Sequence, residues 1–350
     1  MIRNTLLSDV FFLSYFKKSV RFSLFLLGMQ TVPSISVVIP NYNGSEILVE
    51  TIRCAIKALE TSQITDYEII IPDDASIDDS IEVIKANFND VIILKSDLNT
   101  GFAGNTNRGI FEAQKELIFL LNSDVHLTEG YFTSLIPMFA NEKTFGVMGA
   151  IKDAETFKNQ DGAKYPKIIL YNIDSNKNVM SEKEVLPTFF LSGANALIRS
   201  SYLKKIGGFC ELFNPYYSED VELGIRAWRM GWELYFQPQA ICFHETSSTI
   251  KKIDSQSVQL IAKRNKYILH TLHLPKILRF IYLLNISLNS LFKLLVGNKV
   301  HFLALVSFWK MYSRISAEIL ARHTSEENKF THSLFQIEKK IKDLLDKNFS

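Results

Sequence analysis

The sequence predicts an α/β protein in which a mostly parallel, Rossmann-like sheet is flanked by helices and followed by a helical C-terminal extension. Between residues 34 and 124, short β-branched runs alternate with segments of helical apolar spacing, a pattern typical of right-handed βαβ units. From residue 276 onward, apolar side chains recur mainly at helical spacing. A chain of 350 residues with 47% hydrophobic side chains has room for one large domain with an appendage, or for two domains.

Each predicted element follows from a local pattern. SISVVIPNYNG, residues 34–44, is a β-branched run ended by Pro, Asn and Gly, so it predicts a buried strand that enters a loop. Residues 45–60 follow with a candidate Ser cap and helical spacing. The same reasoning predicts strand 67–76, helix 77–88, strand 91–99, a glycine-punctuated loop leading into a helix over 101–116, and strand 117–124.

Polar clusters follow three of these strands: Pro40–Asn43, Asp73–Ser76 and Asn122–Asp124. Taken alone, the last cluster is most simply a turn, since Asn, Ser and Asp are common turn residues. Three such clusters at the carboxyl edge of one parallel sheet favour a ligand site instead. Neither GxGxxG after the first strand nor the P-loop pattern is present. Carboxylates holding a metal ion are another way to neutralise a diphosphate.

Charge is distributed unevenly along the chain. The first 32 residues carry four basic side chains and one acidic one, and residues 251–350 carry 17 and 7, although the net charge of the whole chain is only +2. The segment between them is therefore strongly acidic. Basic, hydrophobic ends suit an anionic surface, and an acidic centre suits a cation or a cation-bridged ligand. No nucleic-acid-binding motif accompanies the basic ends, so nucleic acid is not an expected partner. Three cysteines without metal-type spacing favour a reducing, cytoplasmic setting.

These patterns divide the chain into an amphipathic N-terminal segment, 1–32, a catalytic-type domain, 33–250, and a basic helical extension, 251–350. The N-terminal segment has no uninterrupted apolar run of spanning length and no clear signal-peptide order. The extension has a helical apolar face, whereas Arg279, Lys293 and two Asn residues argue against a membrane-spanning helix. A helix in the membrane interface and a helix packed on the domain both remain open. The residues on this face are Ile277, Phe280, Ile281, Leu284, Leu288, Leu291 and Leu295. Residues 333–348 predict a second amphipathic helix with a charged face.

Five blocks, in order, resemble the family-2 inverting glycosyltransferases of the GT-A fold, and most closely their bacterial rhamnosyltransferase-like members. The resemblance covers about residues 34–248. It lies in VVIPNYNG, DDASIDDS, NTGFAGNTNRGI, LNSDV and YYSEDVELGIRAWRMGW. Each block alone is a weak signal, but five in the same order are a strong one.

The resemblance implies a nucleotide site and a metal site. Asp73 would accept from the base N–H of a uracil or thymine nucleotide, and Asp124 with His244 would hold the Mg²⁺ or Mn²⁺ that bridges the diphosphate. The family pattern at the metal is D-x-D, whereas the first position here is Asn122. The other residues that the resemblance places at the nucleotide are Pro40, Asn41, Tyr42, Asn43, Asp74, Ser76, Gly101, Phe102, Asn107 and Ser123.

The resemblance also places the catalytic base in the acidic block. Asp220 matches the family base, with Glu219 as its neighbour and runner-up, and burial among the aromatic residues would help to tune it. Gly193 and Ala194 would lie under the sugar, and Arg226 would hold either a structural carboxylate or a phosphate. Arg264 and Asn265 would contact the diphosphate or fix the C-terminal helix, and the sequence does not decide between these roles.

The expected function is inverting, metal-assisted transfer of a hexosyl or rhamnosyl group. The donor would be a nucleotide-sugar, dTDP- or UDP-linked, and the acceptor a hydroxyl of a polysaccharide or lipid-linked glycan at the cytoplasmic face of the cell membrane. A catalytically degenerate scaffold is the alternative that Asn122 supports. A sugar-phosphate nucleotidyltransferase is less favoured, because PNYNGSEI lacks a basic, glycine-rich loop.

Overall fold

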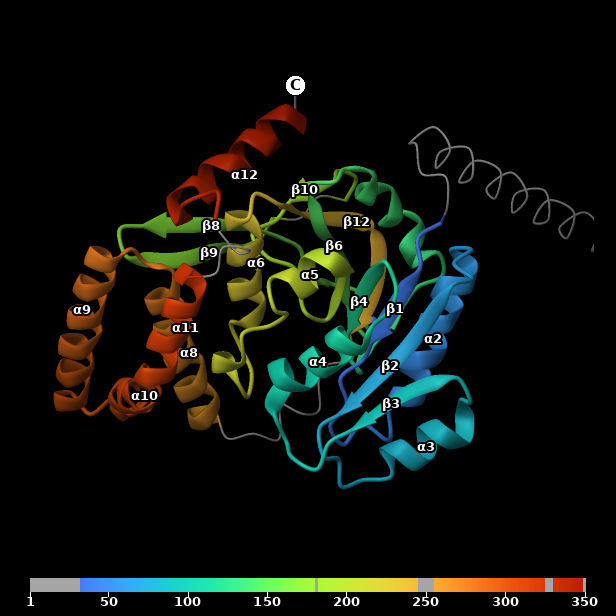
Figure 1. Ribbon diagram of the computed structural model, residues 1–350, viewed down its shortest axis with the longest axis horizontal. Helices are drawn as coiled ribbons and strands as arrows, with labels where there is room; N and C mark the ends of the chain where they lie inside the picture. The colour runs from blue at the N-terminus through green and yellow to red at the C-terminus, as the bar shows by residue number, and fades with distance from the viewer. Residues whose placement is uncertain (1–31, 180–181, 245–254, 325–329, 349–350) are drawn as a thin grey trace, which may run out of the picture.

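The computed structural model describes residues 32–179, 182–244, 255–324 and 330–348. Figure 1 shows the predicted alternation of strands and helices in the first part of the chain. The expectations for residues 1–31 lie outside the described residues. In chain order the first elements are β1 (Ile35–Val38), α2 (Leu48–Thr61), β2 (Tyr67–Asp73), α3 (Ser80–Asn87), β3 (Val91–Lys95), α4 (Gly101–Glu112) and β4 (Leu117–Leu121).

The first four strands form a parallel sheet in the order β3-β2-β1-β4. All five side chains of β4 are buried, and they alternate between two cores. Ile118 and Leu120 face the core that α4 covers, whereas Leu117, Phe119 and Leu121 face the core that α2 covers. A strand buried on both faces reads as a continuous apolar run, which explains LIFLL.

The second half of the sheet is mixed, so the expected mostly parallel arrangement is continuous only across the first four strands. β11 runs antiparallel to both β4 and β6, and β12 runs parallel to β6. These elements are β5 (Val125–Leu127), η1 (Tyr131–Thr133), η2 (Ile136–Ala140), β6 (Thr144–Asp153), β7 (Asn159–Asp161), β8 (Ala163–Ile169), β9 (Asn172–Val179), β10 (Leu186–Pro187), β11 (Asn195–Arg199), α5 (Ser200–Lys205), η3 (Glu211–Phe213), α6 (Glu219–Arg229) and β12 (Glu233–His244). The α/β fold with helices on both faces is confirmed.

The C-terminal extension is helical, as expected, and packs directly on the domain (Figure 1). Ile268, Ile315 and Ile341 belong to the same buried core as Trp228 of the domain. The amphipathic helix predicted over 333–348 is one of these helices, and its apolar side is part of that core. The helices are α8 (Ser255–His273), α9 (Lys276–Leu295), α10 (Lys299–Lys310), α11 (Tyr312–Thr324) and α12 (Leu334–Asn348).

Candidate active site

A cleft of about 530 Å³ lies at the carboxyl edge of the parallel strands. The loops after β1, β2 and β4, the N-terminal end of α4, the loop before β11 and the first turn of α6 form its walls. It is lined by Pro40, Asn41, Tyr42, Asp74, Asn99, Gly101, Phe102, Asn105, Asn122, Ser123, Asp124, Ser192, Gly193, Ala194, Pro215, Tyr216, Tyr217, Glu219 and Asp220. The predicted site residues that do not line it are Asn43, Asp73, Ser76, Asn107, Arg226 and His244.

Asp73 lies directly behind the cleft wall and is bonded to the protein. Its carboxylate accepts from Asn41 Nδ2 at 2.7 Å, from Ser76 Oγ at 2.6 Å and from the Ser76 backbone N–H at 3.1 Å. A carboxylate has about four acceptor positions, so one remains after these three bonds. Asn43 reinforces the same junction, because its backbone N–H donates to Ser76 Oγ at 2.9 Å. Asp73 and Ser76 therefore fix the shape of the loop that carries Pro40, Asn41 and Tyr42.

Asp74 ties the second strand to the start of α4. Its oxygens accept from the backbone N–H groups of Thr100 and Gly101, at 2.7 and 2.9 Å. Gly101 has a φ of +76°, and a Cβ there would lie 2.9 Å from Asn214 Oδ1, so only glycine fits without strain. The segment expected to be a glycine-punctuated loop is helical from Gly101 itself. Phe102 then projects from the first turn of this helix into the cleft lining.

The strand end after β4 presents oxygen atoms to the cleft. Asn122 Oδ1 and Asp124 Oδ1 are buried and have no hydrogen-bond partner among the described residues. The pairing of β4 with β11 brings the loop before β11 to these oxygens, because the Asn122 N–H donates to the carbonyl of Ala194 at 3.1 Å. Ser123 is held from behind, since its carbonyl accepts from Thr51 Oγ1 at 2.5 Å.

His244 lies beside Asp124 although it does not line the cleft. Its Nε2 is 3.3 Å from Asp124 Oδ2, and its Nδ1 is 2.8 Å from Gln160 Oε1. The bond to Asp124 raises the pKa of His244 above its usual value. No group of three or more His, Cys, Asp or Glu side chains suited to a metal ion occurs in the described parts of the chain. Two unpartnered oxygens and a neighbouring imidazole nonetheless fit a divalent cation that takes its remaining ligands from phosphate and water.

Glu219 and Asp220 form the first turn of α6 and face the cleft. Burial, together with the charge of Asp220, raises the pKa of Glu219 to about 8. Burial raises the pKa of Asp220 to about 6, although the nearby ammonium of Lys164 opposes the shift. Glu219 Oε2 is buried without a partner among the described residues. Groups with pKa values moved toward neutrality are suited to proton transfer.

The aromatic loop before α6 is fastened by the C-terminal extension. Asn265 of α8 is fully buried, and its Nδ2 is within 2.7–2.8 Å of the carbonyls of Phe213, Tyr216 and Tyr217. Arg264 donates to Asn265 Oδ1 at 2.8 Å and so fixes the orientation of the amide. Of the two roles left open for this pair, the described contacts fix the loop against α8.

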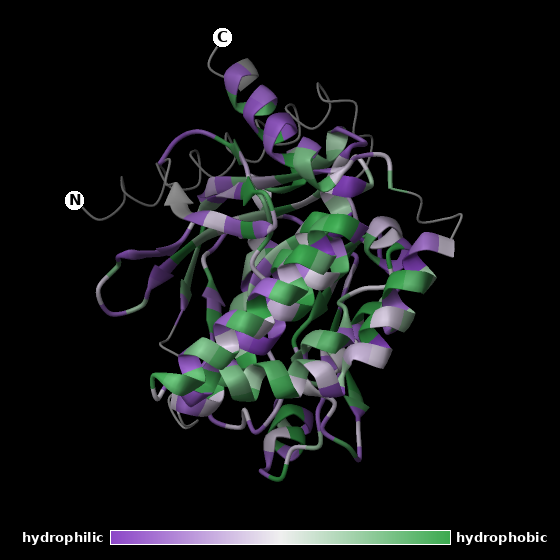
Figure 2. Ribbon diagram, turned by 90° about the vertical axis from the view of Figure 1, so that its left-hand side faces the viewer, coloured by the Kyte–Doolittle hydropathy of each residue, from purple (hydrophilic) through white to green (hydrophobic). Residues whose placement is uncertain are grey.

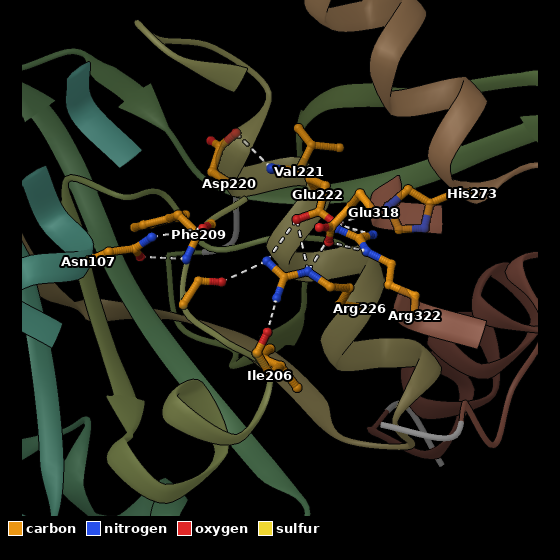
Figure 3. A network of polar contacts seen from close by, with 11 residues as sticks. Asn107, Ile206, Phe209, Asp220, Val221, Glu222, Arg226, His273, Glu318 and Arg322 are labelled. Atoms are coloured by element: carbon orange, nitrogen blue, oxygen red, sulfur yellow. Dashed lines mark hydrogen bonds and ion pairs between the residues drawn. The ribbon is translucent and has the colours of Figure 1, made fainter. Parts of the chain in front are cut away.

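Arg226 and Asn107 lie elsewhere. Arg226 is paired with Glu222 at 2.7 Å and donates to two backbone carbonyls (Figure 3). Asn107 binds the backbone of Phe209 through both atoms of its amide. Both line a separate cavity of about 760 Å³ between α6 and α11. Arg226 therefore holds a structural carboxylate, one of the two roles expected for it.

Several residues at the cleft were not among the predicted site residues. Tyr216 and Tyr217 line it, and Lys164 acts on the charge of Asp220. Lys164 comes from an irregular hairpin and pairs with Asp161 at 2.7 Å. The tyrosine pair, which only Ser218 separates from the acidic pair, was a usable signal, whereas nothing local points to Lys164.

Comparison with known proteins agrees with this geometry. Residues 36–207 match Glycosyl transferase family 2. These residues form a family 2 glycosyl transferase domain. The chain is 26% identical over 243 residues to chondroitin synthase of Escherichia coli, covering 61% of this chain and 35% of the synthase. It is 27% identical over 257 residues to the GalNAc(5)-diNAcBac-PP-undecaprenol beta-1,3-glucosyltransferase of Campylobacter jejuni, covering 71% and 74% of the two chains.

The fold of the family 2 domain is also found among solved structures. GalNAc-T7, crystallised with UDP, GalNAc and Mn²⁺, aligns with a TM-score of 0.60 at 13% identity, over 91% of this chain and 58% of that one. The GT-A fold is thereby confirmed. The expected closeness to rhamnosyltransferases has weaker support. The N-acetylglucosaminyl-diphospho-decaprenol L-rhamnosyltransferase of Mycobacterium tuberculosis is 23% identical over 208 residues, covering 52% of this chain and 67% of the relative.

Proposed function

We propose that this protein transfers a sugar from a nucleotide-diphosphate donor to a hydroxyl group of a polysaccharide or lipid-linked glycan, with inversion at the anomeric carbon. The observation that carries the proposal is the cleft itself. It brings a strand-end carboxylate with unpartnered oxygens, Asp124, into the same cavity as a half-buried carboxylate of raised pKa, Asp220. Asp124 suits a divalent cation that would bridge the phosphates of a donor, and Asp220 suits the proton of an acceptor hydroxyl.

The two carboxylates of α6 take different roles. With a pKa of about 6, Asp220 is mostly ionised at neutral pH and accepts the proton of the attacking hydroxyl. With a pKa of about 8, Glu219 is mostly protonated at neutral pH and acts as a hydrogen-bond donor in the cleft. The first turn of α6 also favours negative charge through the helix dipole, which helps Asp220 to stay ionised.

The donor side is assigned to the loops after β1, β2 and β4. Tyr42 and Pro40 offer a surface for the base, and the remaining acceptor position of Asp73 would read a uracil or thymine imide. Asp124, Asn122 and His244 would hold Mg²⁺ or Mn²⁺, which would supply positive charge against the leaving diphosphate. The presence of Mn²⁺ and UDP in the GalNAc-T7 structure supports this part of the proposal.

The acceptor and sugar are proposed from the relatives. The Campylobacter and Mycobacterium enzymes are named for acceptors on undecaprenol and decaprenol diphosphate. A lipid-linked glycan at the cytoplasmic face of the membrane is therefore our proposed acceptor. A hexosyl group, with rhamnosyl as one member of that class, is our proposed sugar.

A thermal-shift panel tests the donor site. UDP, dTDP, GDP and CMP are each added with and without Mn²⁺, and we expect stabilisation by UDP or dTDP that increases with the metal. A nucleotide at 100 times its dissociation constant adds about 2.7 kcal/mol to the free energy of unfolding. In the Asp124→Asn variant the metal-dependent part should disappear. If no nucleotide stabilises the wild-type chain, the catalytically degenerate scaffold replaces this proposal.

A further inference from the structure

Helix α9 carries apolar side chains on its outer side as well as on the side that packs against the protein. Tyr282, Ile286 and Ser290 are buried at i, i+4 and i+8, and Tyr282 stacks on His270 of α8 with ring centroids 4.8 Å apart. The outer side is also apolar, as Figure 2 shows for the helices that lie at the left of Figure 1. It consists of Ile277, Phe280, Ile281, Leu284, Leu288, Leu291, Phe292 and Leu295, all exposed. We call these eight residues the apolar α9 face.

A water-facing helix normally has charged or polar side chains on its outer side. Here Leu284 is 54%, Leu288 60% and Phe280 70% exposed. The adjoining helix α10 adds Leu303 and Trp309, which are also exposed. A contiguous apolar surface of this extent on a globular protein marks an interaction site.

The charge around the apolar α9 face indicates its partner. The sequence contains no Asp or Glu between Asp254 and Glu318, whereas nine Lys and Arg residues lie in that interval. Exposed Lys276 begins α9, and Lys293 and Lys299 lie at its other end. Lys293 is close enough to Lys263 of α8 to lower its pKa further below the usual range. Asp174 of β9 offsets one of these bases, because it pairs with Lys266 of α8 at 3.4 Å. Apolar side chains on a segment with an excess of bases are complementary to an anionic lipid surface.

The packing of α9 fixes its orientation relative to such a surface. The helix is long and apolar enough to cross a membrane by length and composition. However, Tyr282 contacts Tyr171 of the β8–β9 connection, with ring centroids 6.0 Å apart, and the ring of His270 in α8. A helix with one side fastened to a globular domain cannot be surrounded by lipid, so it lies along the surface. Helix α8 connects this region to the cleft, because Asn265 of the same helix holds the cleft loop.

We propose that the apolar α9 face docks this protein on an anionic lipid bilayer, with α9 parallel to the membrane and its leucines at the boundary of headgroups and acyl chains. Docking of this kind would hold the cleft beside a lipid-linked acceptor. Only that consequence rests on the proposed function, because the docking itself needs no donor or transfer.

Vesicle flotation with the full chain tests the proposal. The protein is mixed with phosphatidylcholine vesicles, or with vesicles that also contain phosphatidylglycerol. We expect it to float mainly with the anionic vesicles.

Leu284→Glu should lower the partition coefficient about tenfold or more, because it removes the apolar contact of one leucine and adds repulsion between a carboxylate and the anionic lipid. Lys293→Glu should weaken binding to anionic vesicles in particular. The matched control is Leu98→Glu, the same change at a 74% exposed leucine in the connection between β3 and α4, outside the apolar α9 face.

The outcomes separate this proposal from its rivals. Equal binding to neutral and anionic vesicles, or unchanged binding of Leu284→Glu, overturns it. If the wild type binds no vesicle and is a dimer that Leu284→Glu converts to a monomer, a second copy of the chain covers the face instead. The nucleotide thermal shift is measured on the same preparations. If nucleotides stabilise the protein but it binds no vesicles, only the docking proposal is overturned. If it binds anionic vesicles but no nucleotide stabilises it, only the transferase proposal is overturned.

Discussion

We expect ionised Asp220 to lower the stability of the protein while it supports the activity. Its pKa of about 6 lies above the ordinary value of 3.8, so the folded state holds this proton more tightly than the unfolded state. The resulting stabilisation is complete below pH 3.8 and is lost as the pH rises through 6. At neutral pH, Asp220→Asn should therefore raise the free energy of unfolding by about 1 to 3 kcal/mol, while lowering kcat by a factor of about 100 or more.

Urea denaturation from pH 3.5 to 8 checks the stability part. The advantage of Asp220→Asn over the wild type should grow between pH 3.8 and 6 and then remain constant. Glu219→Gln is the control for the assignment of the base, because it removes the neighbouring carboxyl but leaves Asp220 in place. A larger loss of kcat in Glu219→Gln than in Asp220→Asn would reverse the two roles.

A second expectation at this scale concerns Asn122, where the family pattern has an aspartate. Asn122→Asp would place a second carboxylate beside Asp124, whose Oδ1 is unpartnered among the described residues. We expect Mn²⁺ to bind about ten times more tightly to the variant, because an added anionic ligand strengthens binding of a hard cation. In the absence of metal the variant should be less stable, since two carboxylates repel. Titration of Mn²⁺ by electron paramagnetic resonance measures the affinity.

The control for this substitution is Asn99→Asp, which adds the same charge to the cleft lining near α4. Its Mn²⁺ affinity should change less than that of Asn122→Asp. Equal affinities in the two variants would show that the strand end after β4 is not the metal site.

Residue types and their order along the chain were sufficient to predict which strand ends meet at the cleft. They did not predict the direction of each side chain. Asp73 was expected to read a base, and the sequence did not show that Asn41 and Ser76 fill three of its acceptor positions and leave one for that role. Arg226 is a second example. Its partner Glu222 lies one turn away on the same helix, but the sequence does not show that both side chains are buried in the protein interior. Hydrogen-bond partners depend on packing, which a linear pattern does not contain.

At the scale of elements, helix α8 should act on the rate through the loop that it holds. Asn265→Ala leaves the carbonyls of Phe213, Tyr216 and Tyr217 without their donor, and a buried unsatisfied group costs about 1–3 kcal/mol. We expect lower stability and, well below the melting temperature, a lower kcat, because Tyr216 and Tyr217 line the cleft. Limited proteolysis should show faster cleavage within residues 213–218.

Asn289→Ala is the matched control, since Asn289 is an exposed asparagine in the middle of α9. It should leave kcat and the cleavage pattern as in the wild type. An Asn265→Ala protein with normal kcat and a protected loop would contradict the role given to α8.

The strand–helix alternation up to β4 was predictable because buried parallel strands and their crossover helices have clear sequence periods. The antiparallel strand β11 and the pairing of β12 with β6 were less predictable from the sequence. β12 contains Pro238 and has register shifts between Gln237 and Ile241, which interrupt a regular pattern. The attachment of α8 to the cleft loop joins residues about 50 positions apart, and no local signal specifies such a contact.

For the whole molecule, a buried ion network joins helix α6, which carries Asp220, to the C-terminal extension. Glu222 of α6 accepts from Arg226 of the same helix, from Arg322 of α11 at 2.7 Å and from His273 of α8 at 3.2 Å (Figure 3). The two guanidinium groups, helped by the hydrogen bond to His273, hold the pKa of Glu222 well below its usual range, against the effect of burial. The sequence suggested a domain at 33–250 and a separate extension, whereas we propose that the two parts fold as one unit.

Removal of one cation tests this unity. Arg322→Met leaves buried Glu222 with less compensation, and we expect a loss of about 3 kcal/mol in the free energy of unfolding, measured by urea denaturation. Arg314→Met is the control, because Arg314 lies on the same helix but is exposed.

In the double variant Glu222→Gln, Arg322→Met, the loss of unfolding free energy should be at least about 1 kcal/mol smaller than the sum of the losses in the two single variants. If Arg322→Met unfolds in two separate transitions, with the nucleotide shift confined to one, the extension is an independent domain. A single cooperative transition at lower urea would mean that the helix carrying Asp220 depends on α11 for its stability.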